Sequence, residues 1–366
     1  MSDQIVLKLN NRPGNPRNSE GSFVTLRDGR ILFIYTRYRG KSWADHASAV
    51  LAARESADGG RTWSRKDRVV VDHEGACNVM SVSLLRLHNG RIALFYLRKN
   101  SGQDCRPWMR TSRDEGATWS RPTCCIPAPG YFVVNNDRVV QLRSGRLVVP
   151  AAFHRSIRVS KPGDGGGLDG RSIFMMFLSD DGGATWRESK DWWALPVRSR
   201  SGFQEPGVVE LKGKTLYGWA RTDTGRQWDS VSRDQGDTWA PLKPSPFRAP
   251  CAPLCMKRIP STGDLLAVWN DHDVRWKRLP QFRRRWGTDR SWGRTPLVVG
   301  ISRNEGKTWP VRRLIESNPD HGYCYTAIHF ADDAVLLAYC CGGGSRSHVL
   351  QDVCIRRLPL AALYGC

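Results

Sequence analysis

The sequence lacks a hydrophobic run long enough to cross a membrane. No apolar stretch in its 366 residues approaches the roughly 18 that a spanning helix needs. The first residues, Met1 to Lys8, also lack the basic segment followed by an apolar segment that marks a secretory signal peptide. From these absences we expect no membrane span and a cytoplasmic protein.

A disulfide framework is missing too. The 11 cysteines are odd in number, and two pairs are adjacent in sequence, Cys124 with Cys125 and Cys340 with Cys341. This pattern is typical of free thiols in a reducing compartment. Cys251 and Cys255 form a single C-x3-C pair without a partner pair, so we expect no zinc site.

The chain also lacks the motifs of nucleic-acid-binding modules, although its net charge is +21. A large positive net charge attracts acidic molecules, and it is also compatible with a basic surface that is only solvated. We therefore expect an acidic substrate, not a nucleic acid.

What the chain does contain is one short motif, repeated five times. It reads S-x-D-x-G-x-T-W at 56–63, 112–119, 179–186, 232–239 and 302–309, with Asn304 replacing the Asp in the last copy. In such a turn the Asp or Asn side chain accepts hydrogen bonds from its own backbone, and the Gly supplies a positive φ. The Trp is a large packing anchor. Five copies along the whole chain indicate a repeat architecture.

Six stretches predict β-hairpins, at 22–38, 81–98, 137–154, 207–221, 256–270 and 325–341. Each contains β-rich runs around a tight turn, such as Asp28-Gly29 or Asn89-Gly90. Each of the first five is followed by a third strand that leads into one copy of the motif. The sequence thus predicts an all-β, six-bladed β-propeller of four-stranded antiparallel blades, in one domain over 1–366. A strand at 5–9 is expected to complete the last blade.

Blade topology predicts which polar residues share a face. The start of strand one, the end of strand two and the start of strand three lie at one end of an antiparallel blade, and the motif turns lie at the other. Seven polar residues from four blades fall on the first face, namely Arg17, Arg37, Asp45, Glu205, Arg221, Arg294 and Tyr323.

These residue types indicate chemistry on an acidic sugar. Arginines can bind a carboxylate through bidentate, charge-assisted hydrogen bonds. A Tyr beside a Glu provides a phenol nucleophile with a base for its proton, and an Asp with a raised pKa can protonate a leaving oxygen. A neutral phenol suits this substrate, because an anionic nucleophile would repel the carboxylate beside the reacting carbon.

The repeated motif resembles the Asp-box of the sialidase (neuraminidase) family, and further residues resemble the site of that family. Arg17 stands where the family has Arg-Ile-Pro, although Asn18 and Ser19 follow it here. Asp45 precedes the first box, and Glu205 with Arg221 resembles the family's Glu–strand–Arg segment. Arg294 precedes the last box, and Tyr323 stands near the C-terminus.

The resemblance implies a retaining exo-α-sialidase that releases sialic acid or a related nonulosonic acid and needs no metal or organic cofactor. Sialidases use a Tyr nucleophile where most glycosidases use a carboxylate. It implies that Arg17, Arg221 and Arg294 bind the carboxylate. Tyr323, deprotonated by Glu205, would attack the anomeric carbon, with Asp45 as acid and then base.

Several alternatives stay open. Tyr325 is the alternative to Tyr323 as nucleophile. The run Asn135-Asn136-Asp137-Arg138 has no assigned role in that family and falls near the predicted active face, as do Glu20, His46, Asn78 and His154. We include Asn136, Arg138 and Arg37 among the predicted substrate contacts. The rival functions are a hydrolase or lyase for another acidic sugar, and a glycan-binding propeller without catalysis.

Overall fold

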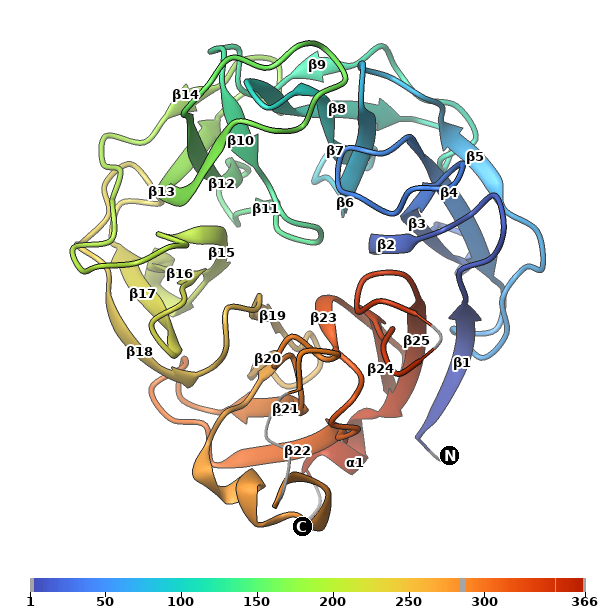
Figure 1. Ribbon diagram of the computed structural model, residues 1–366, viewed down its shortest axis with the longest axis vertical. Helices are drawn as coiled ribbons and strands as arrows, with labels where there is room; N and C mark the ends of the chain where they lie inside the picture. The colour runs from blue at the N-terminus through green and yellow to red at the C-terminus, as the bar shows by residue number, and fades with distance from the viewer. Residues whose placement is uncertain (1–2, 284–287, 346, 365–366) are drawn as a thin grey trace.

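The computed structural model describes residues 3–283, 288–345 and 347–364. Their sheets stand in a ring around a central axis, as in a β-propeller (Figure 1). The helical segments are short: η1 (Lys212–Lys214), η2 (Val274–Arg278), η3 (Pro280–Phe282) and α1 (Leu360–Tyr364). Within the described ranges, no helix combines the length and the apolar character needed to span a bilayer.

Four sheets contain four antiparallel strands each. One consists of β2 (Asn18–Thr25), β3 (Ile31–Tyr38), β4 (Ala49–Ser56) and β5 (Arg68–Val71). Another consists of β15 (Gln204–Glu210), β16 (Leu216–Arg221), β17 (Arg226–Ser232) and β18 (Lys243–Arg248). The next along the chain consists of β19 (Cys255–Arg258), β20 (Leu265–Asn270), β21 (Leu297–Ser302) and β22 (Val311–Glu316).

The fourth of these sheets joins the two ends of the chain. Its order is β1 (Gln4–Leu9), β25 (Val353–Pro359), β24 (Ala334–Cys340) and β23 (Cys324–Ala331). The N-terminal strand β1 pairs antiparallel with β25, from Gln4 opposite Arg357 to Leu9 opposite Val353. The first strand of the chain therefore lies in the same sheet as the last.

The remaining strands form one nine-stranded sheet. They are β6 (Asn78–Arg86), β7 (Ile92–Ser101), β8 (Asp104–Ser112), β9 (Thr123–Cys124), β10 (Tyr131–Val133), β11 (Val140–Gln141), β12 (Leu147–Ser156), β13 (Leu168–Ser179) and β14 (Arg187–Glu188). Strand β10 joins the two halves, because it pairs antiparallel with β12 and, at Tyr131 and Cys105, parallel with β8. Separate four-stranded units are thus observed for four sheets, whereas the predicted second and third blades share one.

The repeated motifs form the turns that follow the third strands, as predicted. In the first copy, Asp58 Oδ1 accepts the backbone N–H of Thr62 at 2.9 Å, and Asp58 Oδ2 accepts the Thr62 hydroxyl at 2.6 Å. Gly60 has a φ of 83° and donates its N–H to Ser56 Oγ at 2.9 Å. In the last copy Asn304 Nδ2 donates to the Thr308 hydroxyl at 2.8 Å, so Asn preserves the contact with reversed polarity.

Apolar side chains fill the space between neighbouring sheets. On β3, Phe33 packs in a cluster with Leu336 of β24, whereas Leu32 and Ile34 pack in a cluster with Val82 of β6. Alternate side chains of β3 are thus buried against the two neighbouring sheets, because successive side chains of a strand point to opposite faces of its sheet. Both faces of β3 are covered, and its first four residues, Ile31 to Ile34, are all apolar.

Four of the inner strands share a β-bulge. The pairing register shifts between Ser19 and Ser22 in β2, between Met80 and Ser83 in β6, between Gln204 and Gly207 in β15, and between Cys324 and Ala327 in β23. One residue in each shift has a positive φ: Glu20 (47°), Ser81 (59°), Glu205 (48°) and Tyr325 (58°). A bulge re-aims a side chain out of the regular alternation, and bulges are common beside active sites.

Candidate active site

The bulges surround a cavity of about 190 Å³. Its lining includes the four bulge residues Glu20, Ser81, Glu205 and Tyr325. It also includes the polar residues Asp45, Lys99, Tyr131, Asn135, His154 and Arg221, and the apolar residues Met80, Leu97, Val133 and Leu168. The same backbone irregularity in four separate strands therefore aims four different side chains at one space.

Tyr325 lies in hydrogen-bond contact with Glu205. Its hydroxyl donates to Glu205 Oε1 at 3.1 Å, and Arg221 Nη1 lies 3.3 Å from the same hydroxyl and 2.8 Å from Glu205 Oε2. Burial and the charge of Glu205 raise the pKa of Tyr325, and the nearby arginines Arg221 and Arg294 offset only part of that rise. The phenol is therefore neutral near pH 7 and has a base in contact with its proton.

Tyr323, the predicted nucleophile, lies elsewhere. Its ring packs edge-on against Tyr339, with 6.2 Å between ring centroids, and lines a separate hollow of about 680 Å³ together with Ile5 and Lys8. The prediction that Tyr323 lies beside Glu205 is therefore wrong. The physical reason is the bulge, since the positive φ of Tyr325 turns that ring into the cavity.

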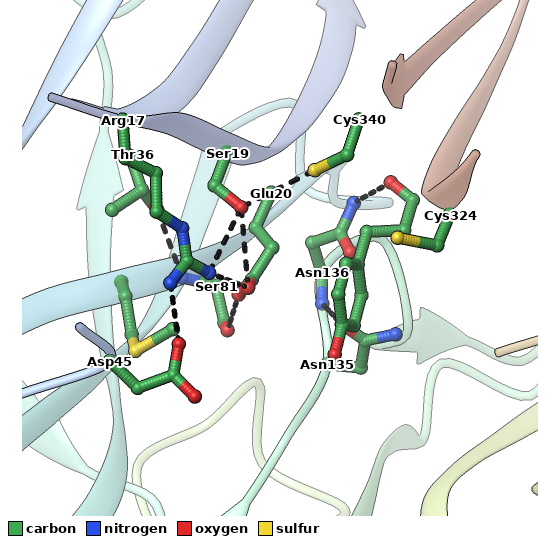
Figure 2. Close-up of polar contacts among 12 residues, drawn as sticks. Arg17, Ser19, Glu20, Thr36, Asp45, Ser81, Asn135, Asn136, Cys324 and Cys340 are labelled. Atoms are coloured by element: carbon green, nitrogen blue, oxygen red, sulfur yellow. Dashed lines mark hydrogen bonds and ion pairs between the residues drawn. The ribbon is translucent and has the colours of Figure 1, made fainter. Parts of the chain in front are cut away.

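Arg17 lies between two carboxylates (Figure 2). Its side chain is 1% exposed; Nη1 donates to Asp45 Oδ1 at 2.5 Å and Nη2 donates to Glu20 Oε1 at 3.2 Å. Glu20 also accepts a hydrogen bond from the Ser81 hydroxyl. Burial raises the pKa of Glu20 above its usual value, although Arg17 and Ser81 oppose the shift.

Asp45 has the opposite environment to the one predicted for a general acid. Desolvation raises the pKa of Asp45, but the charges of Arg17 and Lys99 outweigh this and hold the pKa below the usual range. The expected raised pKa is therefore wrong in this arrangement. The Asp45 carbonyl accepts hydrogen bonds from Lys99 Nζ at 3.0 Å and from Asn78 Nδ2 at 2.9 Å, which position its loop.

Arg294 supplies a third guanidinium near the cavity. Its guanidinium carbon lies 5.4 Å from the centroid of the Tyr325 ring, and Nη1 donates to Cys324 Sγ at 3.1 Å. Its charge also contributes to the lowered pKa of Asp45. The three arginines predicted to bind a carboxylate, Arg17, Arg221 and Arg294, thus lie around Tyr325 and Asp45.

The prediction that Arg37 contacts substrate is wrong, because its side chain is paired with Asp67. Arg37 Nη1 bonds to Asp67 Oδ2 at 2.8 Å, and the Tyr35 hydroxyl bonds to Asp67 Oδ1 at 2.9 Å. Because β3 is regular, residues 35 and 37 point the same way, toward Asp67 and away from the cavity.

Asn136 and Arg138 are not among the residues that line the cavity, and their assignment to substrate binding stays a prediction. Asn136 Nδ2 donates to the backbone oxygens of Gly21 at 2.8 Å and Tyr325 at 3.1 Å, and the Arg138 guanidinium lies 5.7 Å from the Trp219 ring. These contacts tie the inner strands together. Asn135, the first residue of the run, is the member that lines the cavity.

Ser81, Lys99 and Tyr131 line the cavity although the sequence did not single them out. Lys99 is 4% exposed, and opposing influences of burial and of neighbouring acidic groups leave its pKa raised, so it stays cationic. Its signal in the sequence was a cation near the end of the apolar run Ile92-Ala93-Leu94-Phe95-Tyr96-Leu97. Ser81 and Tyr131 had no comparable signal.

Comparison with known proteins places the chain in a family. The BNR repeat-like domain model matches residues 69–337. Sialidase-4 from Mus musculus is 28% identical over 209 residues, which cover 52% of this chain and 39% of the relative. A sialidase from Micromonospora viridifaciens is 26% identical over 341 residues, which cover 85% of this chain and 48% of the relative. The matches therefore span less than half the length of either relative.

A solved structure supports the same fold. The Hadza microbial sialidase Hz136 superimposes with a TM-score of 0.70 at 18% identity, over 95% of this chain and 67% of that one. At this identity the likeness shows the fold alone, an all-β propeller of the sialidase type. Together with the repeated boxes and the family match, these findings establish that the chain belongs to the sialidase family with BNR repeats.

Proposed function

We propose that the protein is a retaining glycoside hydrolase of the exo-α-sialidase type, which releases sialic acid or a related nonulosonic acid from glycans. The observation that carries the proposal is the contact of Tyr325 with Glu205, at 3.1 Å, on the wall of a cavity flanked by three arginines. A glycan-binding protein without catalysis would need neither a nucleophile nor its base.

Recognition of the substrate carboxylate falls to Arg17, Arg221 and Arg294. Guanidinium groups form strong charge-assisted bonds with carboxylates and remain charged when buried. Arg17 and Arg294 are 1% and 7% exposed, so their charges act through little solvent. In this arrangement the substrate carboxylate would take the place of Asp45 on Arg17.

The first chemical step is attack by Tyr325 Oη on the anomeric carbon. The Tyr325 proton passes to Glu205 as the new C–O bond forms, and the bond from the anomeric carbon to the aglycone oxygen breaks. The aglycone oxygen takes a proton from Asp45. A covalent sugar–tyrosine intermediate remains, as in other retaining glycosidases that use a side-chain nucleophile.

Asp45 must be protonated to act as the general acid, and we infer that bound substrate raises its pKa. A carboxylate bound to Arg17 removes the partner that favours ionised Asp45 and adds a negative charge beside it, and both effects raise a carboxyl pKa. In the second step Asp45 takes a proton from water, the water oxygen attacks the anomeric carbon, and Tyr325 leaves and recovers its proton from Glu205.

The test uses two neighbouring tyrosines as a matched pair. Release of the fluorescent aglycone from a 4-methylumbelliferyl α-sialoside is measured for wild type, Tyr325→Phe and Tyr323→Phe. We expect Tyr325→Phe to lower kcat by at least about 10³-fold, on the scale of other nucleophile deletions, and Tyr323→Phe to stay close to wild type. A 2,3-difluorinated sialic acid should label Tyr325 in the wild type, because Tyr325 Oη displaces the fluoride at the anomeric carbon and the protein gains the mass of the reagent less HF. Full activity of Tyr325→Phe, or a label on another residue, would contradict the proposal.

We also propose that the nine-stranded sheet represents two blades, so that six blades close the ring. Strands β6 to β9 and strands β11 to β14 each follow the order of the separate four-stranded units. The halves meet through β10, whose contact with β8 is the one residue pair Tyr131 and Cys105. An experimental structure would test the count.

A further inference from the structure

Three aromatic rings from three separate loops meet beside the arginines of the candidate site. The ring of His348 is stacked on that of Trp43, with 4.1 Å between centroids, and its centroid is 4.7 Å from that of Trp292, at an interplanar angle of 66°. Trp43 lies between β3 and β4, Trp292 between β20 and β21, and His348 between β24 and β25. This aromatic stack of Trp43, His348 and Trp292 therefore joins three of the sheets.

The two tryptophans of the aromatic stack are close to functional side chains of the site. The Trp43 carbonyl accepts a hydrogen bond from Arg17 Nη1 at 3.3 Å, and Asp45 follows two residues later in the same loop. Trp292 lies two residues before Arg294, whose guanidinium carbon is 5.2 Å from the centroid of the Trp292 ring. The aromatic stack thus connects the loop of Asp45 with the segment that carries Arg294.

Core packing does not account for the positions of these two tryptophans. Trp43 is 37% exposed and Trp292 is 40% exposed. Trp292 also has a φ of 52°, in the left-handed region that a bulky side chain enters only at a cost in free energy. Such a conformation persists where surrounding contacts fix it, and it is common at functional sites. For Trp292 those contacts are with His348 and Arg294.

His348 is anchored to the strand that begins beside Arg17. Its backbone N–H donates to Gln351 Oε1 at 2.6 Å, and the Gln351 N–H donates to the His348 carbonyl at 3.0 Å. Gln351 Nε2 donates to the Pro16 carbonyl at 2.8 Å, and the Gln351 carbonyl accepts the Asn18 N–H at 2.9 Å. Burial and the charge of Arg17 lower the pKa of His348, so its ring is neutral near pH 7. His348 is therefore an uncharged ring in a fixed position.

We propose that His348 is a positioning residue, which holds Trp43 and, through Trp43, the loop that carries the general acid Asp45. This inference rests on the function proposed above, because it takes Asp45 to be the acid. It goes beyond that function by assigning a role in the reaction to a residue that is not among those lining the cavity.

The proposed reaction itself creates the need for such a residue. In the structure Arg17 Nη1 donates to Asp45 Oδ1 at 2.5 Å, and this ion pair holds the acid. Once the substrate carboxylate takes the place of Asp45 on Arg17, the ion pair no longer positions the acid. Lys99 and Asn78 still hold the Asp45 carbonyl, but they fix the main chain at one point only. The aromatic stack fixes the same loop at a second point, which determines its orientation.

The test compares two substrates that differ in how much they need the acid. An aglycone that leaves as an alkoxide needs a proton far more than one that leaves as a stabilised phenolate, so a misplaced acid affects the two unequally. The substrates are methyl α-sialoside and 4-methylumbelliferyl α-sialoside. We would measure kcat/KM on both, from released sialic acid and from fluorescence, for wild type, His348→Ala and His348→Phe. The Phe variant is the matched control, because it keeps a ring that can stack.

We expect His348→Ala to lower kcat/KM on the methyl glycoside by about 10–10²-fold, on the scale of a misplaced catalytic group. Its loss on the aryl glycoside should stay below about threefold, and His348→Phe should stay within about threefold of wild type on both. Trp43→Ala should reproduce the unequal loss. Equal losses on the two glycosides would overturn the proposal. A larger loss on the aryl glycoside would indicate direct contact with the aglycone and would overturn it as well.

Hydrogen exchange of the loop 39–48, followed by mass spectrometry, tests the same proposal without a substrate. In this loop the Arg39 N–H donates to the Ser48 carbonyl and the Ala47 N–H donates to the Ala44 carbonyl, both at 2.8 Å. His348→Ala should speed the exchange of these amides by at least about threefold, and His348→Phe should not. Faster exchange in a protein whose wild type hydrolyses neither glycoside would refute the hydrolase and leave the hold of His348 on the loop standing. Hydrolysis with unchanged exchange would do the reverse.

Discussion

The Asp-box turns and the bulges, which lie at opposite ends of the sheets, use repetition in opposite ways. At one end the Asp-box turns repeat the same side chains, so that Asp58, Asp114, Asp181 and Asp234 all bind a Thr four residues on. At the other end the bulges repeat the same backbone conformation with different side chains, Glu20, Ser81, Glu205 and Tyr325. Repeated side chains stabilise a fold, whereas a repeated backbone with varied side chains assembles a site from unlike groups.

Strand pairing places these two ends apart. In the first sheet Ile31 pairs with Thr25 and with Ser56, the first residue of the box, whereas Arg37 pairs with Asn18 at the bulge end. Six residues of extended strand separate Ile31 from Arg37, or roughly 20 Å. Substitutions at the two ends should therefore affect different properties, activity at the bulges and stability at the boxes.

Two glutamates of one strand, β15, allow the bulge end and the box end to be compared directly. Glu205 lines the cavity, and Glu210 lies near the box end. Glu210 accepts hydrogen bonds from the Arg143 backbone at 2.9 Å and from its side chain at 3.2 Å. We expect Glu205→Gln to lower kcat/KM by roughly 10²–10⁴-fold through loss of the base. Glu210→Gln should leave kcat/KM within about twofold, since surface ion pairs contribute little. Similar losses in both variants would refute the division between the ends.

A large loss of stability is expected from the box end. Trp239 is 2% exposed, packs edge-on against Phe174 with 5.6 Å between centroids, and donates Nε1–H to the Gly236 carbonyl at 3.1 Å. Trp239→Ala should lower the free energy of unfolding by about 3–5 kcal/mol while the protein that remains folded keeps its KM. Urea denaturation measures the first quantity and initial rates the second. Trp192→Ala is the control, because Trp192 is 55% exposed and its loss should change stability by less than about 0.5 kcal/mol.

The smallest expected effect concerns acid stability of the boxes. Hydrogen bonds from Thr118 and Thr185 lower the pKa of Asp114 and of Asp181 to about 2 each, below the roughly 3.9 of an unfolded Asp. A lowered folded pKa contributes stability above the unfolded value, and that contribution is lost as pH falls from about 4 to 2. The double variant Asp114→Asn, Asp181→Asn should therefore show a smaller drop in Tm between pH 6 and pH 2 than the wild type. Parallel drops would mean that these carboxylates do not contribute.

Much of this architecture could be predicted from the sequence, because its signals are local. The box network of Asp58 closes within four residues, so the sequence of the turn is enough to predict it. The strand order around each box follows from the hairpin turns. Arg17, Asp45, Glu205, Arg221 and Arg294 also lie where blade topology predicts, since the end of a strand is known once its turn is known.

The errors share one cause, which is that a bulge or a distant contact overrides the regular alternation. The bulge has no marker in the sequence Cys324-Tyr325-Thr326, so the sequence predicts Tyr323 and not Tyr325 as the nucleophile. The pKa of Asp45 depends on Arg17, 28 residues away, and on Lys99, 54 residues away. Asn136 contacts Tyr325 and Arg138 contacts Trp219, both from other sheets, and the sequence alone does not predict these contacts.

The sequence by itself determined the repeated boxes, the β-sheet architecture and the supply of arginines, carboxylates and tyrosines at one end of the sheets. Hydrogen bonds within a turn and side-chain alternation along a strand act over a few residues, so they can be read from the chain. Only the tertiary structure decided that Tyr325 meets Glu205, that Asp45 is held ionised on Arg17, and that His348 meets the rings of Trp43 and Trp292. Those properties arise where strands from different sheets converge, and there the neighbours in space set the charge, burial and hydrogen bonding of each group.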